Sequence, residues 1–363
     1  MKICVYAIAK NEAKFVERWM ESMKEADEIY VLDTGSTDNT VELLKNCGAH
    51  VHIKKIDPWR FDVARNESLK LVPQDTDVCV CTDLDEVFDK GWRKHLEKAW
   101  KKDTTRAKYN YNWSLDENDN PLVNFYGEKI HTRNGYKWTH PVHEILSYEF
   151  EKESIVIIDK IILNHYPDNT KSRSNYLPLL ELAVKESPED DRNVHYLGRE
   201  YMYYNKWNEA IDILIKHLNL KTATWKEERA ASMRYIARCY RALKRYEEAR
   251  MWLDKAMKET PHVREPYVER AMLEYDLENW KEIEKYGLKA LEITERQMYY
   301  INEPFSWDHT IYDLLSLSAY YQGYYQKALE YINLALEISP KHERLLNNKK
   351  LIENKIKELE KTE

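Results

Sequence analysis

The sequence predicts an α/β domain followed by an all-α domain of helical repeats, and three patterns support that prediction. In the first hundred residues, short apolar runs alternate with amphipathic stretches, as in a sheet covered by helices on both faces. From about 104 to 165, aromatic and apolar runs flank polar turn segments. Beyond about 170 the periodicity is almost wholly helical, and it repeats. We therefore expect one domain over residues 1–186 and a second over 187–363.

The composition limits the class of protein. The 363 residues are 43% apolar, which is enough to fill the cores of two or three domains. A formal charge of −7 argues against a nucleic-acid partner, because proteins that bind phosphate backbones usually have a basic excess. No apolar run approaches the roughly 20 residues that span a bilayer, and the first ten residues form a strand instead of a signal peptide. We expect a cytoplasmic protein whose five cysteines are reduced.

In the first domain, strands and helices alternate, which favours a mostly parallel sheet. The first four strands are expected at 2–8, 28–33, 50–53 and 78–83. The helices between and after them are expected near 12–24, 37–46, 60–71 and 90–101. A hairpin follows, in which 109–113 and 122–126 flank a polar turn. A last apolar strand covers 155–163, so this part of the domain is expected to finish the pocket.

The second domain is predicted to be a solenoid of helix pairs. Four similar segments begin at Trp207, Tyr246, Trp280 and Tyr325. Ten positions after these starts come His217, Ala256, Ala290 and Ala335, where small residues let paired helices approach. The spacings of 39, 34 and 45 residues resemble tetratricopeptide repeats that carry insertions, one of them at 297–306. The last stretch, 341–363, is expected to be a charged capping helix.

A cluster of carboxylates follows the fourth apolar run. The segment Asp83-Leu84-Asp85-Glu86 stands directly after a buried strand. Ligands of parallel sheets bind beyond the carboxyl ends of the strands, and carboxylates there can hold a divalent cation together with phosphate oxygens. The alternative is a turn in which the aspartates only cap backbone groups.

Two further side chains favour the first interpretation. Asp33 ends the second strand and precedes a Gly-Ser-Thr turn, and its carboxylate can accept the imide N–H of uracil. Its alternative role is to cap that turn. Arg65 can hold a diphosphate in forked geometry, or it can form an ordinary surface ion pair.

Together these segments resemble family 2 glycosyltransferases of the GT-A fold, which is Rossmann-like. The resemblance rests on four motifs in order: Ile8-Ala9-Lys10-Asn11-Glu12, Val31 to Thr40, Ala64 to Ser68, and the Asp83-Leu84-Asp85-Glu86 cluster. More narrowly, the chain is similar to the bacterial and phage branch that carries C-terminal tetratricopeptide repeats. The resemblance covers the first domain and, more loosely, the repeats.

The resemblance implies a hexosyltransferase that uses a nucleotide-linked sugar, with UDP-glucose as the first expectation, and inverts the anomeric carbon. By position, the donor site would contain Ala9, Asn11, Glu12, Asp33, Arg65 and Asp83. In this DXD motif, Asp85 would hold Mg²⁺ or Mn²⁺. Leu84 stands where the branch usually has a small residue, so we expect a slightly altered sugar pocket.

An inverting transferase also needs a base for the acceptor proton. Relatives carry a similar Val-His-Glu sequence, which makes Glu144 the first candidate and His143 the second. The alternative for Glu144 is a position in the first turn of a short helix. His165 is a candidate further metal ligand or a hydrogen-bonded strand-end residue, and Lys171 and Arg173 are candidate diphosphate contacts or solvated cations.

Acceptor and partners stay open at this point. Some relatives with this architecture glycosylate peptides, so a peptide or protein side chain is one acceptor; a saccharide, a lipid or a modified nucleobase is another. The repeats would bind that acceptor or form a homodimer. Two other functions compete: a repeat-based binding module with an inactive transferase domain, and a nucleotidyltransferase. The second usually has a Gly-rich loop after its first strand, where this chain has Ala9-Lys10-Asn11-Glu12.

Overall fold

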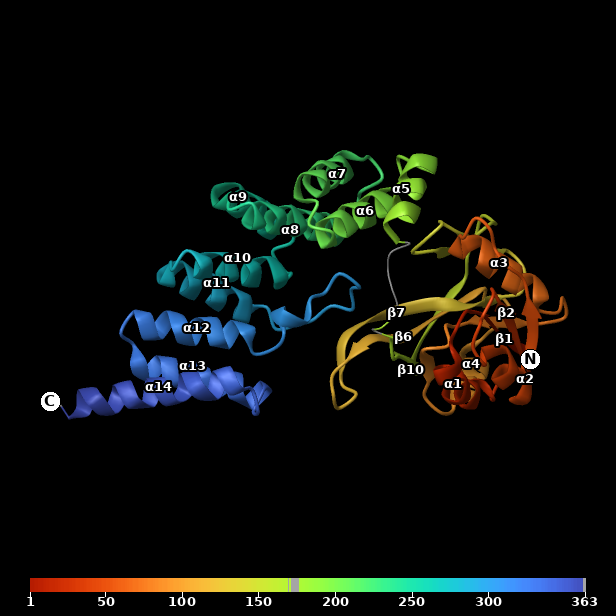
Figure 1. Cartoon of the computed structure of the whole chain (residues 1–363), viewed down its shortest axis with the longest axis horizontal. Helices are drawn as coiled ribbons and strands as arrows, with labels where there is room; N and C mark the ends of the chain where they lie inside the picture. Colours follow the sequence, from red (N-terminus) through yellow and green to blue (C-terminus); the bar gives the residue numbers. More distant parts are fainter. Residues whose placement is uncertain (169, 171–175, 362–363) are drawn as a thin grey trace. The chain divides into compact units, whose positions relative to one another are not determined.

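The computed structural model describes residues 1–168, 170 and 176–361 and divides into two compact units. The first unit contains Met1–Glu186 together with Met298–Tyr300 (Figure 1). The second contains Ser187–Gln297 and Ile301–Glu363. The first is built around a sheet, and the second consists of helices.

The first unit contains an eight-stranded mixed sheet with the order β3-β2-β1-β4-β7-β6-β10-β5. Its strands are β1 (Ile3–Ala9), β2 (Glu28–Asp33), β3 (His50–Ile53), β4 (Val78–Cys81), β5 (Glu86–Phe88), β6 (Arg106–Leu115), β7 (Pro121–Thr132) and β10 (Ile155–His165). Strands β3, β2, β1 and β4 are parallel neighbours, and β10 is parallel to β6. Strand β7 is antiparallel to β4 and β6, and β5 to β10. A separate ribbon pairs β8 (Tyr136–Thr139) with β9 (Ile145–Tyr148).

Alternate residues of β1 face two different cores. Ile3, Val5 and Ala7 belong to a core that also contains residues of α1 (Val16–Met23), α2 (Thr40–Asn46) and α4 (Trp92–Ala99). Cys4 and Tyr6 belong to a second core, with α3 (Phe61–Leu71) and the β8–β9 ribbon. Strand side chains alternate between faces, so the sheet is covered on both sides. A short 3-10 helix, Ala13–Phe15, precedes α1, and α5 covers Tyr176–Glu186.

The predicted α/β class is confirmed, with two differences in detail. The sheet is mixed, because β7 and β5 return antiparallel to their neighbours. The hairpin strands are also longer than the aromatic runs that predicted them, since β7 continues to Thr132. This extension is important for the site, because it brings Lys129 next to the carboxylates of the β4–β5 turn.

The second unit is a series of helix pairs followed by one long helix. The helices are α6 (Asp191–Tyr203), α7 (Trp207–Asn219), α8 (Lys226–Ala242), α9 (Tyr246–Glu259), α10 (Glu265–Asp276), α11 (Trp280–Glu292), α12 (Thr310–Tyr321), α13 (Tyr325–Ile338) and α14 (Glu343–Glu360). A 3-10 turn, Pro304–Ser306, ends the predicted insertion. The four predicted segment starts are the first residues of α7, α9, α11 and α13.

The position that predicted the repeats, ten residues after the start of each segment, is a buried position of the second helix in each pair. His217, Ala256, Ala290 and Ala335, ten positions into these second helices, are all fully buried. A side chain there packs between the two helices of a pair. The predicted repeat architecture is confirmed for the described part of the chain. Within residues 1–168, 170 and 176–361, no helix is both long and apolar enough to cross a membrane.

Candidate active site

The predicted site residues lie where the central parallel strands end. In the sheet register Ala9 pairs with Asp33, and Tyr6 pairs with Cys81. The segments that follow β1, β2 and β4 therefore leave the same edge of the sheet. This is the edge at which parallel α/β sheets bind ligands.

Asp33 holds the turn that follows β2. The residue is 1% exposed. Its Oδ1 accepts from the backbone N–H of Gly35 at 3.0 Å and of Ser36 at 2.9 Å, and Oδ2 accepts from the Ser36 hydroxyl at 2.5 Å. The turn-capping role is therefore present in this structure, and a contact from Asp33 to a nucleobase stays a prediction.

The loop after β1 is hydrogen-bonded to this turn. Asn11 adopts a left-handed backbone conformation with φ of 56°, which asparagine tolerates better than most residues. Its Oδ1 accepts from the N–H of Thr37 at 2.8 Å, and its own N–H donates to the Ser36 hydroxyl at 2.8 Å. The N–H of Glu12 donates to Thr40 Oγ1 at 2.8 Å, and the Ala9 carbonyl accepts from the N–H of Thr34 at 2.9 Å. Four predicted donor-site residues thus lie on two hydrogen-bonded loops.

Arg65 of α3 connects two other predicted residues. Its side chain is 4% exposed, and Nη2 lies 2.8 Å from Asp83 Oδ1. On the other side, Nε donates to Glu144 Oε1 at 2.5 Å. The Trp138 ring covers the guanidinium at 5.1 Å. The structure therefore brings Arg65, Asp83 and Glu144 into direct contact, and the surface ion-pair alternative for Arg65 is wrong because the group is buried.

A second cation, Lys129 of β7, completes this cluster. Its Nζ lies 3.2 Å from Asp83 Oδ2 and 3.2 Å from Glu86 Oε1. Burial alone would raise the pKa of Asp83, but the charges of Arg65 and Lys129 outweigh it and hold that pKa well below its usual range. At Glu86 the balance is reversed: burial raises the pKa of this carboxyl even though Lys129 opposes it.

Glu86 is fixed by contacts from both sides. Its Oε1 accepts from the Tyr111 hydroxyl at 2.7 Å, and Oε2 accepts from the N–H of Asp83 at 2.8 Å. Sequence reasoning placed Glu86 in the cluster without a role and missed Lys129 altogether. In the sequence, Lys129 is visible only as a basic residue in the strand that continues the predicted hairpin. Its contacts with Asp83 and Glu86 depend on the pairing of β7 with β4.

Asp85 and His165 form a separate pair. Residue His165 ends β10 opposite Glu86 in the register, and its Nε2 lies 3.4 Å from Asp85 Oδ2. The Trp113 carbonyl is 2.8 Å from His165 Nδ1. A carbonyl only accepts, so Nδ1 carries the proton and Nε2 faces the carboxylate. Burial lowers the pKa of His165, and the hydrogen bond and charge of Asp85 raise it by more.

This pair suits a hard divalent cation. A carboxylate oxygen and an imidazole nitrogen face each other, and the other imidazole nitrogen is held by a backbone carbonyl, as is usual for metal-binding histidines. Mg²⁺ and Mn²⁺ typically take few protein ligands and complete their shell with water and phosphate oxygens. Leu84, between the two aspartates, is 2% exposed and packs in the hydrophobic core. The Leu84 side chain therefore does not line the site, and an effect on the sugar pocket stays a prediction.

The candidate bases lie in a loop between β8 and β9. His140 and His143 both have positive φ, 74° and 52°, which marks a tightly constrained backbone. The Pro141 carbonyl accepts from the N–H of Phe61, so the loop is attached to the start of α3. Glu144 directly precedes β9. The alternative that places Glu144 in the first turn of a helix is wrong, because no helix follows it. The His143 ring lies 5.6 Å from the Tyr176 ring.

The predicted residues therefore form three contact groups: the Asn11–Asp33 loops, the Arg65–Asp83–Glu144 cluster, and the Asp85–His165 pair. The second and third groups are joined through the turn that carries both aspartates. Lys171 and Arg173 lie outside the described residues. The arrangement offers one buried cation, Arg65, and one partly buried cation, Lys129, for an anionic group, and two adjacent groups for a divalent metal.

Comparison with known sequences finds a family match within the first unit. Residues 4–148 match the family described as Glycosyl transferase family 2. The SPbeta prophage-derived glycosyltransferase SunS of Bacillus subtilis is 27% identical over 292 residues, which cover 75% of this chain and 67% of SunS. An uncharacterized glycosyltransferase of Rickettsia felis is 42% identical over 100 residues, covering 26% of this chain and 33% of that protein.

Among solved structures, the second unit is similar to helical-repeat proteins. The crystal structure of MamA shares 18% identity and a TM-score of 0.38, covering 48% of this chain and 97% of MamA. YrrB, described as a TPR protein with an unusual peptide-binding site, shares 16% identity and a TM-score of 0.38, covering 49% of this chain and 83% of YrrB. At these scores the similarities add nothing to the helix pairs already described.

Proposed function

We propose that this glycosyltransferase, whose first unit is a family 2 domain, moves a hexose from a UDP-sugar to an acceptor with inversion of the anomeric carbon. Glucose is the first expectation for the sugar. The observation that supports the proposal most is the contact group around Arg65. It gathers Asp83 and Glu144 next to the Asp85–His165 pair, at the ligand-binding edge of the sheet.

The loops after β1 and β2 would bind the nucleotide. The Asn11 and Asp33 side chains hold these loops in place through backbone N–H groups. A carboxylate is an acceptor, so Asp33 suits the imide N–H of uracil once the base enters. Preorganised loops lower the entropic cost of ordering the site when the donor binds.

Arg65 and Lys129 would bind the donor's anionic groups and hold Asp83 for the sugar or ribose. Arg65 is buried and Lys129 is partly buried, and the attraction of such cations to phosphate is stronger than that of fully exposed ones. A divalent cation bound by Asp85 and His165 would offset the charge that develops on the diphosphate leaving group.

In the transfer itself, the acceptor atom forms a bond to the anomeric carbon while the bond from that carbon to the diphosphate oxygen breaks. The acceptor's proton must go to a base, for which Glu144 is the first candidate and His143 the second. Glu144 is held by Arg65 in the described state, which orients its carboxylate. Because the acceptor displaces the diphosphate in a single step, the anomeric carbon is inverted and one base is enough.

We propose a peptide or protein side chain as the acceptor. Helical repeats offer extended surfaces that suit a peptide, and the second unit contains four helix pairs within its described residues. Saccharide, lipid and nucleobase acceptors are the alternatives. Binding of a second copy of the chain by the repeats is a further role that the same surface could have.

The first test is a thermal-shift panel of nucleotide sugars with Mn²⁺ or Mg²⁺, on the wild-type chain and on Asp85→Asn. We expect UDP and one UDP-sugar to raise the melting temperature only when metal is present, and the variant to lose that shift. Asp89→Asn is the matched control, because Asp89 is exposed on the same segment and contacts Asn164 instead. If no nucleotide shifts the wild type with any metal, the proposal fails and the chain is a binding module.

A further inference from the structure

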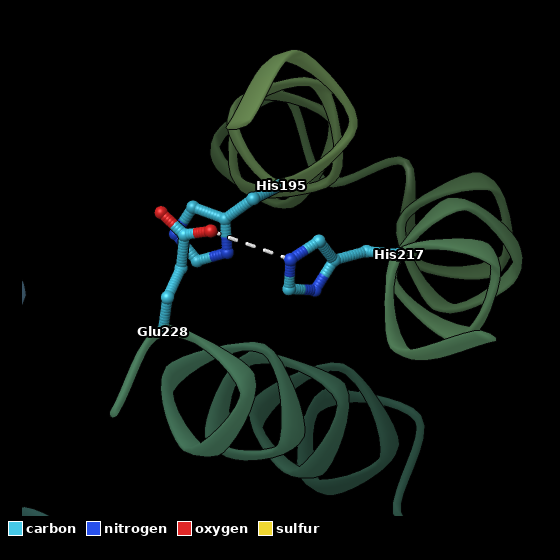
Figure 2. Close-up of side chains that lie close together, drawn as sticks. All are labelled: His195, His217 and Glu228. Carbon is cyan, nitrogen blue, oxygen red and sulfur yellow. Dashed lines mark ion pairs between the residues drawn. The ribbon is translucent and has the colours of Figure 1, made fainter. Parts of the chain in front are cut away.

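Three buried side chains meet in the second unit, where helices α6, α7 and α8 come together (Figure 2). His195 lies on α6, His217 on α7, and Glu228 in the first turn of α8. Both imidazoles are fully buried, and Glu228 is 4% exposed. One nitrogen or oxygen atom of each residue lies within 4.8 Å of those of the other two. Among the described residues, this is the only group of three metal-ligating side chains so close together.

The distance between His217 and Glu228 suits metal ligation better than a hydrogen bond. Nε2 of His217 lies 3.4 Å from Oε1 of Glu228. An N–H···O hydrogen bond usually spans about 2.7–3.2 Å, and this Nε2 has no hydrogen-bond partner in the structure. Two ligands of a tetrahedral Zn²⁺, with bonds of about 2.0–2.2 Å, lie about 3.4 Å apart. The observed spacing is therefore that of two ligands with room for an ion between them.

Ser232 of α8 orients both rings. Its Oγ lies 2.8 Å from Nδ1 of His195 and 2.9 Å from Nδ1 of His217. Metal-binding histidines usually engage their second nitrogen in such a hydrogen bond, which fixes the ring. The Nε2 atom of His195 is buried without a hydrogen-bond partner, as is that of His217. A buried nitrogen that makes no hydrogen bond costs free energy unless something binds it.

Two carboxylates near the cluster favour a cation. A neutral imidazole has a lone pair for a metal. Asp191 is a second carboxylate close enough to Glu228 to feel its charge. A divalent cation would balance these two carboxylates.

Packing alone does not require His217. The equivalent positions in the other three helix pairs are alanines, Ala256, Ala290 and Ala335, and all four are fully buried. The histidine introduces two polar nitrogens where the repeat needs only a small apolar side chain. Such a replacement has a physical reason when the nitrogens bind a ligand.

We propose that His195, His217 and Glu228 bind one divalent transition metal ion, with Zn²⁺ as the best match, in the first helix pair of the repeat unit. Two imidazoles and one carboxylate are a known zinc ligand set, and water completes the tetrahedron. The ion would connect α6, α7 and α8 and stabilise the start of the solenoid. It is distinct from the cation proposed at Asp85 and His165.

The test uses the full-length chain in an Asp85→Asn background, so that the donor site does not contribute. The protein is stripped with a chelator and then given Zn²⁺ in competition with a chromogenic chelator. We expect one tightly bound Zn²⁺ per chain, a gain in melting temperature with Zn²⁺, and loss of both in His217→Ala and in Glu228→Gln. Ser232→Ala should weaken Zn²⁺ binding by about 10–100-fold, because it removes the group that orients the rings.

Glu227→Gln is the matched control, because Glu227 is the neighbouring carboxylate and contacts His262 at 3.1 Å. His217→Ala restores the residue of the other helix pairs, and Glu228→Gln keeps its shape, so both variants should fold; circular dichroism verifies this. The proposal is overturned if the chain binds no Zn²⁺, or if both variants bind it as tightly as the Glu227→Gln control. In either case the cluster is only a hydrogen-bonded part of the repeat core.

Discussion

Arg65 and Glu144 form a buried ion pair although 79 positions separate them in the chain, with Nε 2.5 Å from Oε1. The same guanidinium holds Asp83 at 2.8 Å through Nη2. Only a planar group with several fixed N–H donors can make both contacts at once. Arg65 therefore sets the positions of a proposed donor-site carboxylate and of the proposed base together.

The first prediction concerns the two contacts of the Arg65 guanidinium, with Asp83 and with Glu144. Arg65→Lys keeps the charge but cannot reach both carboxylates, so we expect transferase kcat to fall by about 10²–10³-fold, the usual loss when one preorganised electrostatic contact is removed. Arg60→Lys is the control, because Arg60 also pairs with two carboxylates, Asp62 and Glu186, near the start of the same helix. Steady-state kinetics of both variants gives the kcat values that test this prediction. Equal activity in the two variants would mean that the two Arg65 contacts do not matter to the reaction.

The second prediction concerns the metal pair. His165→Gln should raise the Mn²⁺ concentration needed for nucleotide binding by about tenfold or more, since even second-shell groups contribute about 10–100-fold to metal affinity. Titration of Mn²⁺ into protein with saturating UDP, followed by melting temperature, measures the effect. His52→Gln, at an exposed histidine of β3, is the control. An unchanged Mn²⁺ requirement would identify His165 as a hydrogen-bonded strand-end residue.

The third prediction separates the two candidate bases. Glu144→Gln keeps an oxygen that accepts from Arg65 but removes the basic carboxylate, so kcat should fall by about 10²–10⁴-fold while donor binding is retained. His143→Gln should have a smaller effect. Glu149→Gln, in the exposed segment after β9, is the control. If His143→Gln causes the larger loss in kcat and flattens the pH profile, the assignment of the base is reversed.

Most elements of both units could be predicted because their signals are local, but the short strands β5, β8 and β9 were missed. Apolar runs marked β1 to β4, and the end of β2 at Asp33 agrees with the expected strand. The pairing of β6 with β10, and of β10 with β5, could not be predicted in this way. Strand order depends on contacts between distant segments, and periodicity carries no information about them.

The same limit applies to the site. Asp83 and Asp85 stand in a local cluster, so their proximity was predictable from four consecutive residues. Lys129 was not, because it approaches them only through the register of β7 against β4. Leu84 stands where related chains usually have a small residue, and the fold places its side chain in the core, which the sequence did not indicate.

The fourth prediction concerns pH and stability. His131 is fully buried in the first unit, and its Nε2 accepts from the Tyr6 hydroxyl at 2.8 Å while Nδ1 donates to the Thr132 carbonyl. Burial lowers its pKa to about 3, against 6.5 in an unfolded chain. Between these two pH values the unfolded state binds the extra proton, so stability is complete above pH 6.5 and is lost as the pH falls.

Urea unfolding from pH 7 to pH 4 measures this effect. In His131→Gln the free energy of unfolding should depend less steeply on pH than in the wild type, by up to about 1.4 kcal/mol per pH unit. The exposed His52 is the control position, and His52→Gln should leave the slope unchanged. An unaltered slope in His131→Gln would show that this imidazole takes up its proton without unfolding the sheet.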